Sequence, residues 1–350
     1  MIHSASTATD RSTALRASVS PRILFLRPIF GISASFVKVD QELLGRHFDL
    51  TPMAADLTDH LLPLRLLKAA ANHDLCFVWF ADAHAYHAVN AFRLFGKPVV
   101  MVPGQYELAC APEGNYGLQL EDRKRWRRGM LALRRAAAVL AVSDFHRELI
   151  TEAGVGSGHV RRIYHGFESA TFGMGQAKEN VVVTVSHFRD RQRVWIKGLE
   201  AFAEAAALVP EAQFVIAGDY SAENAEYLQG LAQGRLTLTG SLSAEEIASL
   251  LGRARVYAQL SATETFGCAL AEAMLSECIP VVTNRGSLPE VAGDLGMYVE
   301  YGDAQGTAAA VRKALQANHG AACRERIVEL FPMERREQAL VNAVLSAFPR

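Results

Sequence analysis

Residues 264–293 read ETFGCALAEAMLSECIPVVTNRGSLPEVAG, and this stretch is the most informative part of the sequence. Glu264 follows a strand-like run, a glycine and small residues begin a helix, and Glu272 comes eight positions later inside that helix. The helix is otherwise almost wholly apolar, so it is expected to be buried. A carboxylate in such a helix needs hydrogen-bonding partners, and a ligand can supply them.

The start of this helix is suited to an anion. Its first free N–H groups and the helix dipole attract negative charge, and open α/β sheets bind ligands beyond the carboxyl ends of their strands. The amides concerned belong to Phe266, Gly267, Cys268 and Ala269. In the alternative reading, Glu264 is an ordinary loop acid and Glu272 a solvated helix residue, although its apolar neighbours leave Glu272 little solvated face.

The stretch resembles the signature of retaining glycosyltransferases of family four: Glu, seven residues, Glu, a Pro-Val-Val strand and a Gly-x-x-Pro-Glu-Val turn. The resemblance implies the GT-B fold, in which two doubly wound Rossmann-like α/β domains face each other across a cleft. It also implies that Glu264 lies near the donor sugar, that Glu272 binds the ribose, and that the amides of 266–270, ending at Leu270, hold the diphosphate.

Strand and helix signals alternate along the whole chain, which predicts parallel sheets flanked by helices. A chain of 350 residues is expected to form two domains. The predicted order is a tail at 1–20, an acceptor-side domain at 21–168, a linker at 169–180, a nucleotide-sugar domain at 181–332 and a C-terminal helix at 333–350. By resemblance, that last helix packs back on the N-terminal domain.

Composition indicates a cytoplasmic protein. The five cysteines are scattered and form no C-x-x-C pair, which argues against disulfides and zinc sites. No apolar run approaches the roughly 20 residues that span a bilayer. Residues 1–165 carry 20 Lys and Arg against 15 Asp and Glu, whereas residues 166–350 carry 16 against 22, and this modest asymmetry does not indicate nucleic acid.

Lys197 is the predicted diphosphate contact in the second domain. It begins a helix, where a cation opposes the dipole unless an anion lies nearby. By resemblance, the Lys-Gly pair binds the donor diphosphate together with an upstream arginine. Arg189 takes that place, with Arg191 and Arg193 as competitors, and any of the three arginines could simply be solvated.

Further candidates follow other strands. Gly31 resembles the loop glycine that faces the donor phosphates across the cleft, and Gly240 ends a strand of the second domain. Residues 103–117 resemble a prokaryotic branch of the family with a Gly-Gly-Tyr-Asp run, but Gln105 replaces the second glycine and Glu107 the Asp. The acceptor-side candidates are His84, Gly104, Glu107 and Tyr116.

No metal or cofactor is expected. The chain has no Asp-x-Asp pair, and His84 with His87 lacks a third ligand in view. The donor is therefore expected to be a nucleotide-diphosphate sugar whose leaving charge is met by Lys197, an arginine and helix amides.

A basic run lies at 121–135, with five cations and Trp126 within 123–128. It has two readings: a surface that docks on an anionic membrane, consistent with a peripheral position on the inner face of the plasma membrane, or a solvated helix face.

Together these features predict transfer of a glycosyl group, with retention, to an acceptor hydroxyl in cell-surface polysaccharide or glycolipid assembly. Two alternatives stay open: a GT-B sugar-nucleotide epimerase, which needs no acceptor, and a non-catalytic GT-B regulatory subunit.

Overall fold

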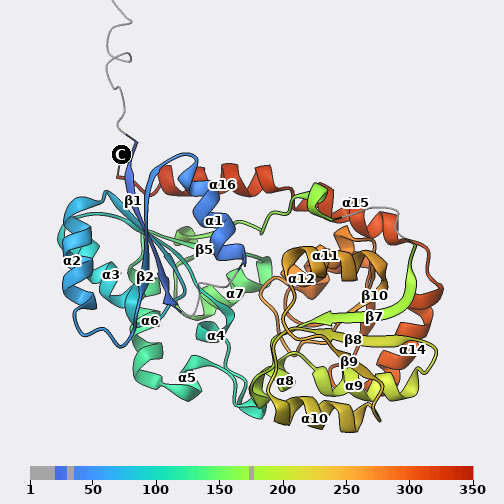
Figure 1. The fold of residues 1–350 in the computed structure, drawn as a ribbon. Helices are drawn as coiled ribbons and strands as arrows, with labels where there is room; N and C mark the ends of the chain where they lie inside the picture. Colours follow the sequence, from blue (N-terminus) through green and yellow to red (C-terminus); the bar gives the residue numbers. More distant parts are fainter. Residues whose placement is uncertain (1–19, 30–34, 173–176, 350) are drawn as a thin grey trace, which may run out of the picture.

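The computed structural model describes residues 20–29, 35–172 and 177–349, so nearly all of the expected tail at 1–20 lies outside the described residues. The chain forms two α/β domains side by side (Figure 1). The N-terminal domain contains a parallel sheet in the order β2-β1-β3-β4-β5-β6. Its strands are β1 (Arg22–Pro28), β2 (Asp49–Ala55), β3 (Leu75–Trp79), β4 (Val99–Val102), β5 (Ala138–Ala141) and β6 (Val160–Arg162).

Helices cover both faces of this sheet, and β3, β4 and β5 are accordingly buried at every position. The α-helices are α1 (Ser35–Gly45), α2 (Leu62–Asn72), α3 (Ala83–Leu94), α4 (Gln105–Leu108), α5 (Leu118–Glu121), α6 (Arg123–Arg135) and α7 (Asp144–Glu152). The short 3₁₀ turns are η2 (Pro112–Gly114), η3 (Ser157–His159) and η4 (Ser169–Thr171).

The C-terminal domain has the parallel order β12-β11-β10-β7-β8-β9. Strands β7 to β9 extend the sheet to one side, and β10 to β12 extend it to the other. The boundary between β7 and β10 is therefore a topological switch point, where open α/β sheets bind ligands. The strands are β7 (Glu179–Val185), β8 (Gln213–Ala217), β9 (Leu236–Leu238), β10 (Ala254–Gln259), β11 (Ile279–Thr283) and β12 (Met297–Val299). The helical segments are α8 (Arg191–Ile196), α9 (Leu199–Leu208), α10 (Ala222–Leu231), α11 (Ala244–Arg253), α12 (Cys268–Leu275), α13 (Leu288–Ala292), η5 (Gly293–Leu295) and α14 (Ala304–Gln316).

The last two helices, α15 (Gly320–Leu330) and α16 (Met333–Leu345), lead back to the first domain (Figure 1). α16 packs against α1. Arg336 of α16 forms an ion pair with Asp40 of α1, with 2.6 Å between Arg336 Nε and Asp40 Oδ1, and both side chains are almost fully buried. The C-terminus therefore belongs structurally to the N-terminal domain.

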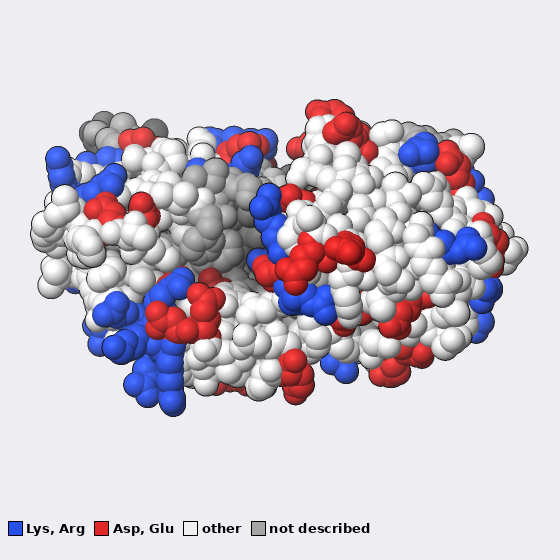
Figure 2. Space-filling view, turned by 60° about the horizontal axis from the view of Figure 1, so that its bottom comes forward, with Lys and Arg blue, Asp and Glu red and all other residues white. Residues whose placement is uncertain are grey.

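The basic helix α6 lies on the outer side of the N-terminal domain, where Figure 2 shows Lys and Arg side chains gathered. Arg125 turns inward and pairs with Asp82 at the start of α3. Trp126 packs against the core of the domain. The exposed cations of the 123–128 run are Arg123, Lys124, Arg127 and Arg128.

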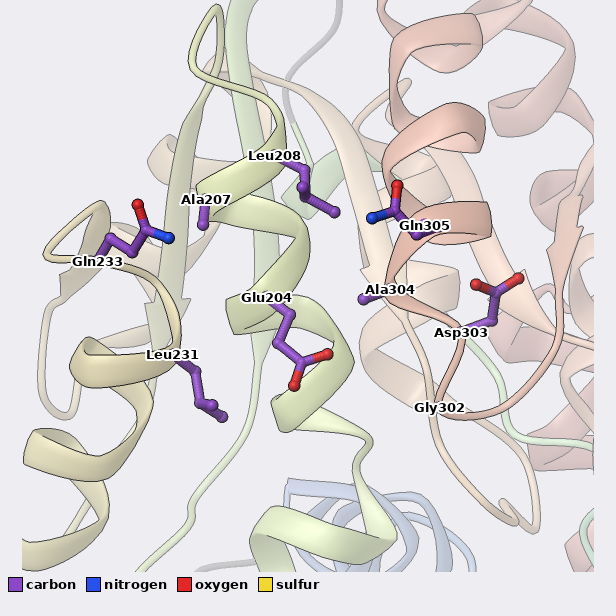
Figure 3. A pocket seen from close by; sticks show the side chains of 9 residues that line it. All are labelled: Glu204, Ala207, Leu208, Leu231, Gln233, Gly302, Asp303, Ala304 and Gln305. Carbon is purple, nitrogen blue, oxygen red and sulfur yellow. The ribbon is translucent and has the colours of Figure 1, made fainter.

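A pocket of about 430 Å³ opens in the C-terminal domain between α9, the turn after α10 and the start of α14 (Figure 3). Its lining includes Glu204 and Asp303. Asp303 accepts a hydrogen bond from the Gly306 amide at 2.8 Å and so caps α14. None of the predicted site residues lines this pocket.

Candidate active site

Lys197 and Glu264 meet at the carboxyl end of β10. Lys197 Nζ lies 2.6 Å from Glu264 Oε2, and Gln259 Nε2 donates to the same oxygen at 2.9 Å. The Lys197 side chain is 26% exposed and that of Glu264 12%. The two residues, 67 positions apart in the chain, thus form a charged pair that an incoming anion can still reach.

The backbone around Gly198 explains this meeting. Gly198 has φ 63°, and a Cβ there would lie 2.0 Å from the Leu260 carbonyl oxygen. Only glycine fits such a conformation and such an approach. The Ala262 amide also donates to the Ile196 carbonyl at 2.8 Å. The turn between α8 and α9 is therefore pressed against the end of β10, which brings Lys197 to Glu264.

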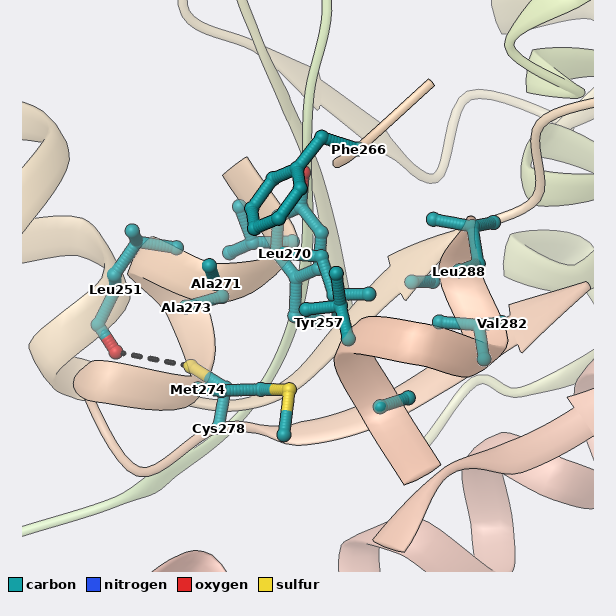
Figure 4. Close-up of a cluster of buried hydrophobic side chains, with 14 of the residues drawn as sticks. Leu251, Tyr257, Phe266, Leu270, Ala271, Ala273, Met274, Cys278, Val282 and Leu288 are labelled. Atoms are coloured by element: carbon teal, nitrogen blue, oxygen red, sulfur yellow. Dashed lines mark hydrogen bonds between the residues drawn. The ribbon is translucent and has the colours of Figure 1, made fainter. Parts of the chain in front are cut away.

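The start of α12 lies directly beyond Glu264. Gly267 is its N-cap with φ 93°, again a left-handed conformation that favours glycine. The helix leaves its first amides, from Cys268 onward, without intrahelical acceptors. The other face of α12 is packed: Leu270 and Met274 gather with Tyr257 and Val282 of the sheet (Figure 4). This packing fixes the helix with its amino end toward the charged pair.

Glu272 lies one helical turn further on, partly buried. Burial raises the pKa of its carboxyl to about 7. Among the described residues, no hydrogen bond reaches this carboxylate. A carboxyl group held without a partner in a largely apolar setting is suited to accept hydrogen bonds from a ligand.

The three competing arginines have different partners. Arg189 pairs with Asp219 and is 72% exposed. Arg191 lies 3.5 Å from Glu200, and its guanidinium stacks 3.6 Å from the centre of the Tyr227 ring. Within the described part of the chain, Arg193 has no ion pair. Arg193 lies in α8 and precedes Lys197, the C-cap of this helix, by four residues, a spacing that places two side chains on the same side of a helix.

The N-terminal domain contributes a buried carboxyl group, Glu107. One of its oxygens has no hydrogen-bond partner among the described residues, and burial raises its pKa to about 7. A Cβ on Gly104 would lie 2.5 Å from that oxygen, so Gly104 makes room for the carboxyl. His84 is fully buried with Nε2 2.8 Å from the Trp79 carbonyl, and burial lowers its pKa. This geometry is that of a structural histidine in the N-terminal domain.

Contacts between the domains close one side of the site. Trp195 of α8 packs on Gly114 of the N-terminal domain. Tyr116 is buried with Ile196 and Ala262. Gln105 Nε2 donates to the Thr263 carbonyl, next to Glu264, at 3.0 Å. Tyr116 therefore lies beside the candidate site. Gln105, a departure from the family motif, forms a hydrogen bond between the two domains.

Two predicted donor-binding glycines, Gly240 and Gly31, remain. Gly240 lies opposite Gly218, whose amide donates to the Gly240 carbonyl at 2.9 Å. Gly31 lies outside the described residues.

Across residues 20–29, 35–172 and 177–349, no three His, Cys, Asp or Glu side chains converge as metal ligands would. Over the same ranges, no helix is long and apolar enough to span a membrane.

Comparison with known proteins gives a family match in the C-terminal domain. Residues 179–317 match the family model described as Glycosyl transferases group 1, a range that runs from the start of β7 to the end of α14. The chain is also similar to N-acetyl-alpha-D-glucosaminyl L-malate synthase of Bacillus anthracis, with 31% identity over 168 residues. That match spans 45% of this chain and 43% of the length of the relative.

The fold is similar to that of solved structures over nearly the whole chain. The structure of HepE from Anabaena in complex with UDP-glucose has a TM-score of 0.76 and 18% identity, and the match covers 93% of this chain and 100% of that one. Sucrose-phosphate synthase of Thermosynechococcus elongatus gives a TM-score of 0.75, 16% identity and the same coverage. The predicted GT-B fold of two Rossmann-like domains is therefore confirmed.

Proposed function

We propose that this protein is a retaining glycosyltransferase of family four, which moves a sugar from a nucleotide-diphosphate sugar to an acceptor hydroxyl. The observation that carries the proposal is the Lys197–Glu264 pair at 2.6 Å beside the open first turn of α12. These groups lie at the switch point of a domain that matches the Glycosyl transferases group 1 model. HepE is described in complex with UDP and UDP-glucose, so a UDP-sugar is the first donor to test.

Each group has a role in this proposal. Glu272 accepts hydrogen bonds from the ribose hydroxyls, and the first amides of α12 hold the diphosphate. Lys197 moves from Glu264 to the diphosphate and neutralises the charge that grows on it as the glycosidic bond breaks. Glu264 then orients a hydroxyl of the donor sugar. Arg193 fits the role of the second cation better than Arg189, which Asp219 already neutralises.

The acceptor enters from the N-terminal domain, over the segment that carries Glu107 and Tyr116. Its hydroxyl oxygen forms the new bond to the anomeric carbon on the face that the diphosphate leaves, and the departing phosphate oxygen takes the hydroxyl proton. The sugar therefore keeps its anomeric configuration, and no separate general base is needed. Assembly of a polysaccharide or glycolipid supplies an acceptor of this kind.

The test is release of nucleoside diphosphate from a panel of nucleotide sugars, with and without sugar acceptors, and NMR of the product anomer. Acceptor-dependent release with a retained anomer supports the proposal. Conversion of a nucleotide sugar to its epimer without an acceptor would identify the epimerase alternative. Binding without any turnover would favour a regulatory subunit. Transfer should also continue in excess chelator, since the sequence has no Asp-x-Asp pair to hold a metal.

A further inference from the structure

Glu290 joins the two domains through its side chain. It lies in α13 of the C-terminal domain, and its carboxylate accepts hydrogen bonds from the amides of Asp144 and Phe145, both at 2.8 Å. These amides belong to the first turn of α7, at the edge of the N-terminal domain that faces its neighbour (Figure 1). The hydroxyl of Tyr164 lies 3.3 Å from the same carboxylate. The domains are thus joined here by one acidic side chain.

The chemistry of this contact makes it specific. The first amides of a helix have no intrahelical acceptor, and the helix dipole favours an anion there. The N-cap Ser143 serves the third amide, that of His146, through its hydroxyl at 2.9 Å. Among the described residues, Glu290 is the acceptor for the first two amides. One carboxylate therefore satisfies two donors with two oxygens.

The same turn of chain holds Glu264. Ser287, three residues before Glu290, donates to the Glu264 carbonyl from its amide at 2.9 Å and from its hydroxyl at 3.0 Å. On the other side, Arg326 donates to the backbone carbonyls of Glu290 and Val291. The contact of Glu290 with α7 is therefore linked to the backbone of Glu264 through the turn that carries Ser287.

We infer that Glu290 is a positioning residue: it clamps α7 of the N-terminal domain and sets the closed arrangement in which Glu264 and Lys197 face the acceptor side. Each contact between the domains is near one member of the candidate pair: Trp195, which packs on Gly114, precedes Lys197 by two residues, and Ser287, beside Glu290, donates to the Glu264 carbonyl. The clamp itself follows from the hydrogen bonds of Glu290 to the amides of Asp144 and Phe145, whereas its effect on transfer rests on the proposed function.

Amide hydrogen exchange tests the clamp without any substrate. Followed residue by residue by NMR in the full chain, the amides of Asp144 and Phe145 should exchange at least about tenfold faster in Glu290→Ala, as expected when a hydrogen bond to a charged acceptor is lost. The amide of His146 should be unchanged, because Ser143 still serves it. Glu290→Asp keeps the charge on a shorter side chain and should restore part of the protection.

The matched control is Glu226→Gln, at an exposed residue of α10. Small-angle X-ray scattering should show a larger radius of gyration for Glu290→Ala than for the wild type and the control. Equal exchange of Asp144 and Phe145 in all four proteins, or a radius that does not change, would overturn the inference.

A second measurement separates the clamp from the proposed reaction. If transfer is found, Glu290→Gln should lower kcat about tenfold or more while the Kd for the nucleotide stays as in wild type, because the proposed nucleotide contacts all lie in the C-terminal domain. A matching loss of nucleotide affinity would instead make Glu290 part of the donor site. If no transfer is found with any donor, the proposed function fails, and exchange and scattering still decide whether the clamp exists.

Discussion

The carboxyl group of Glu272 is partly buried, so its ionised form is unfavourable until a ligand donates a hydrogen bond to it. Burial raises its pKa to about 7, so below that pH the free protein holds it protonated. A ribose hydroxyl that donates a hydrogen bond favours the ionised form. Binding of the donor and loss of the proton are therefore linked.

The affinity for a nucleotide sugar should consequently increase with pH up to about 7 and level off above it. A nucleotide sugar is the correct probe because its diphosphate has no terminal phosphate to titrate in this range. In Glu272→Gln the affinity should be weaker by about 1.5–3 kcal/mol at pH 8 and nearly independent of pH. Isothermal titration of both proteins from pH 5.5 to pH 8 would measure this, and parallel pH curves would remove Glu272 from the site.

The raised pKa of Glu272 also makes the free energy of unfolding depend on pH. An unfolded Glu272 ionises near its ordinary pKa of 4.5 but the folded one only near 7. The free energy of unfolding of the wild type should therefore fall relative to Glu272→Gln as pH rises from about 4.5 to about 7 and differ by a constant amount above that. Urea unfolding at several pH values measures the difference. Glu107, whose pKa is raised likewise, is present in both proteins and cancels.

The arginines offer a matched pair of substitutions. Arg193→Gln should weaken binding of the nucleotide sugar by about 1.5–3 kcal/mol, the loss of one charge-assisted hydrogen bond. Arg189→Gln removes an exposed ion pair and should change affinity by less than about 0.5 kcal/mol. If Arg189→Gln has the larger effect, the diphosphate is held by Arg189, as the sequence resemblance predicts, and not by Arg193 of α8.

At the scale of single elements, α6 carries a surface that we propose binds anionic lipid. Arg125 and Trp126 face the protein, which leaves four exposed cations in the 123–128 run, each contributing about 1 kcal/mol near an anionic surface. The substitutions Arg123→Gln, Arg127→Gln and Arg128→Gln together should abolish binding to anionic vesicles at low salt. The control removes as many exposed cations from the C-terminal domain, at Arg235, Arg253 and Lys313.

Vesicle sedimentation decides this, and binding of the wild type should fade as salt shortens the Debye length below about 8 Å. Equal and negligible sedimentation of wild type and both variants would mean that α6 is a solvated face.

Elements with strong patterns could be predicted from the sequence, and weakly patterned ones could not. The apolar runs of β3 and β11 and the glycine before α12 are local signals. β2, Asp49–Ala55, has no such signal, because it is an edge strand with an exposed face and contains Pro52. The segment 118–135 is also hard to divide from its pattern, yet Asp122 accepts hydrogen bonds from the amides of Lys124 and Arg125 and so begins a new helix, α6, after α5.

The site follows the same division between local and distant information. Glu264, Glu272 and Lys197 lie in short motifs of one domain, so the sequence alone is enough to name all three as candidates. The contacts of Trp195 with Gly114 and of Glu290 with α7 join residues 81 and more than 140 positions apart. Nothing in either segment alone indicates them, since they depend on how the two domains face each other.

For the whole molecule, the buried pair Arg336–Asp40 fixes the C-terminal helix to the first domain. Arg336→Leu should destabilise the protein by about 3–5 kcal/mol, because it leaves Asp40 buried without its partner. The double variant with Asp40→Leu should recover much of this loss. Urea unfolding of the three proteins measures it, and a double variant as unstable as the single one would mean that packing, not charge, is responsible.

The central claim is that the C-terminal domain binds a nucleotide-diphosphate sugar through α12 and Lys197. A thermal unfolding screen of such sugars, beginning with UDP-glucose, tests it most directly. One donor, at 100 times its Kd, should stabilise the wild type by about 2.7 kcal/mol and should stabilise Glu272→Ala far less at the same concentration. No stabilisation by any nucleotide sugar at millimolar concentration, or equal stabilisation of wild type and Glu272→Ala, would contradict the account.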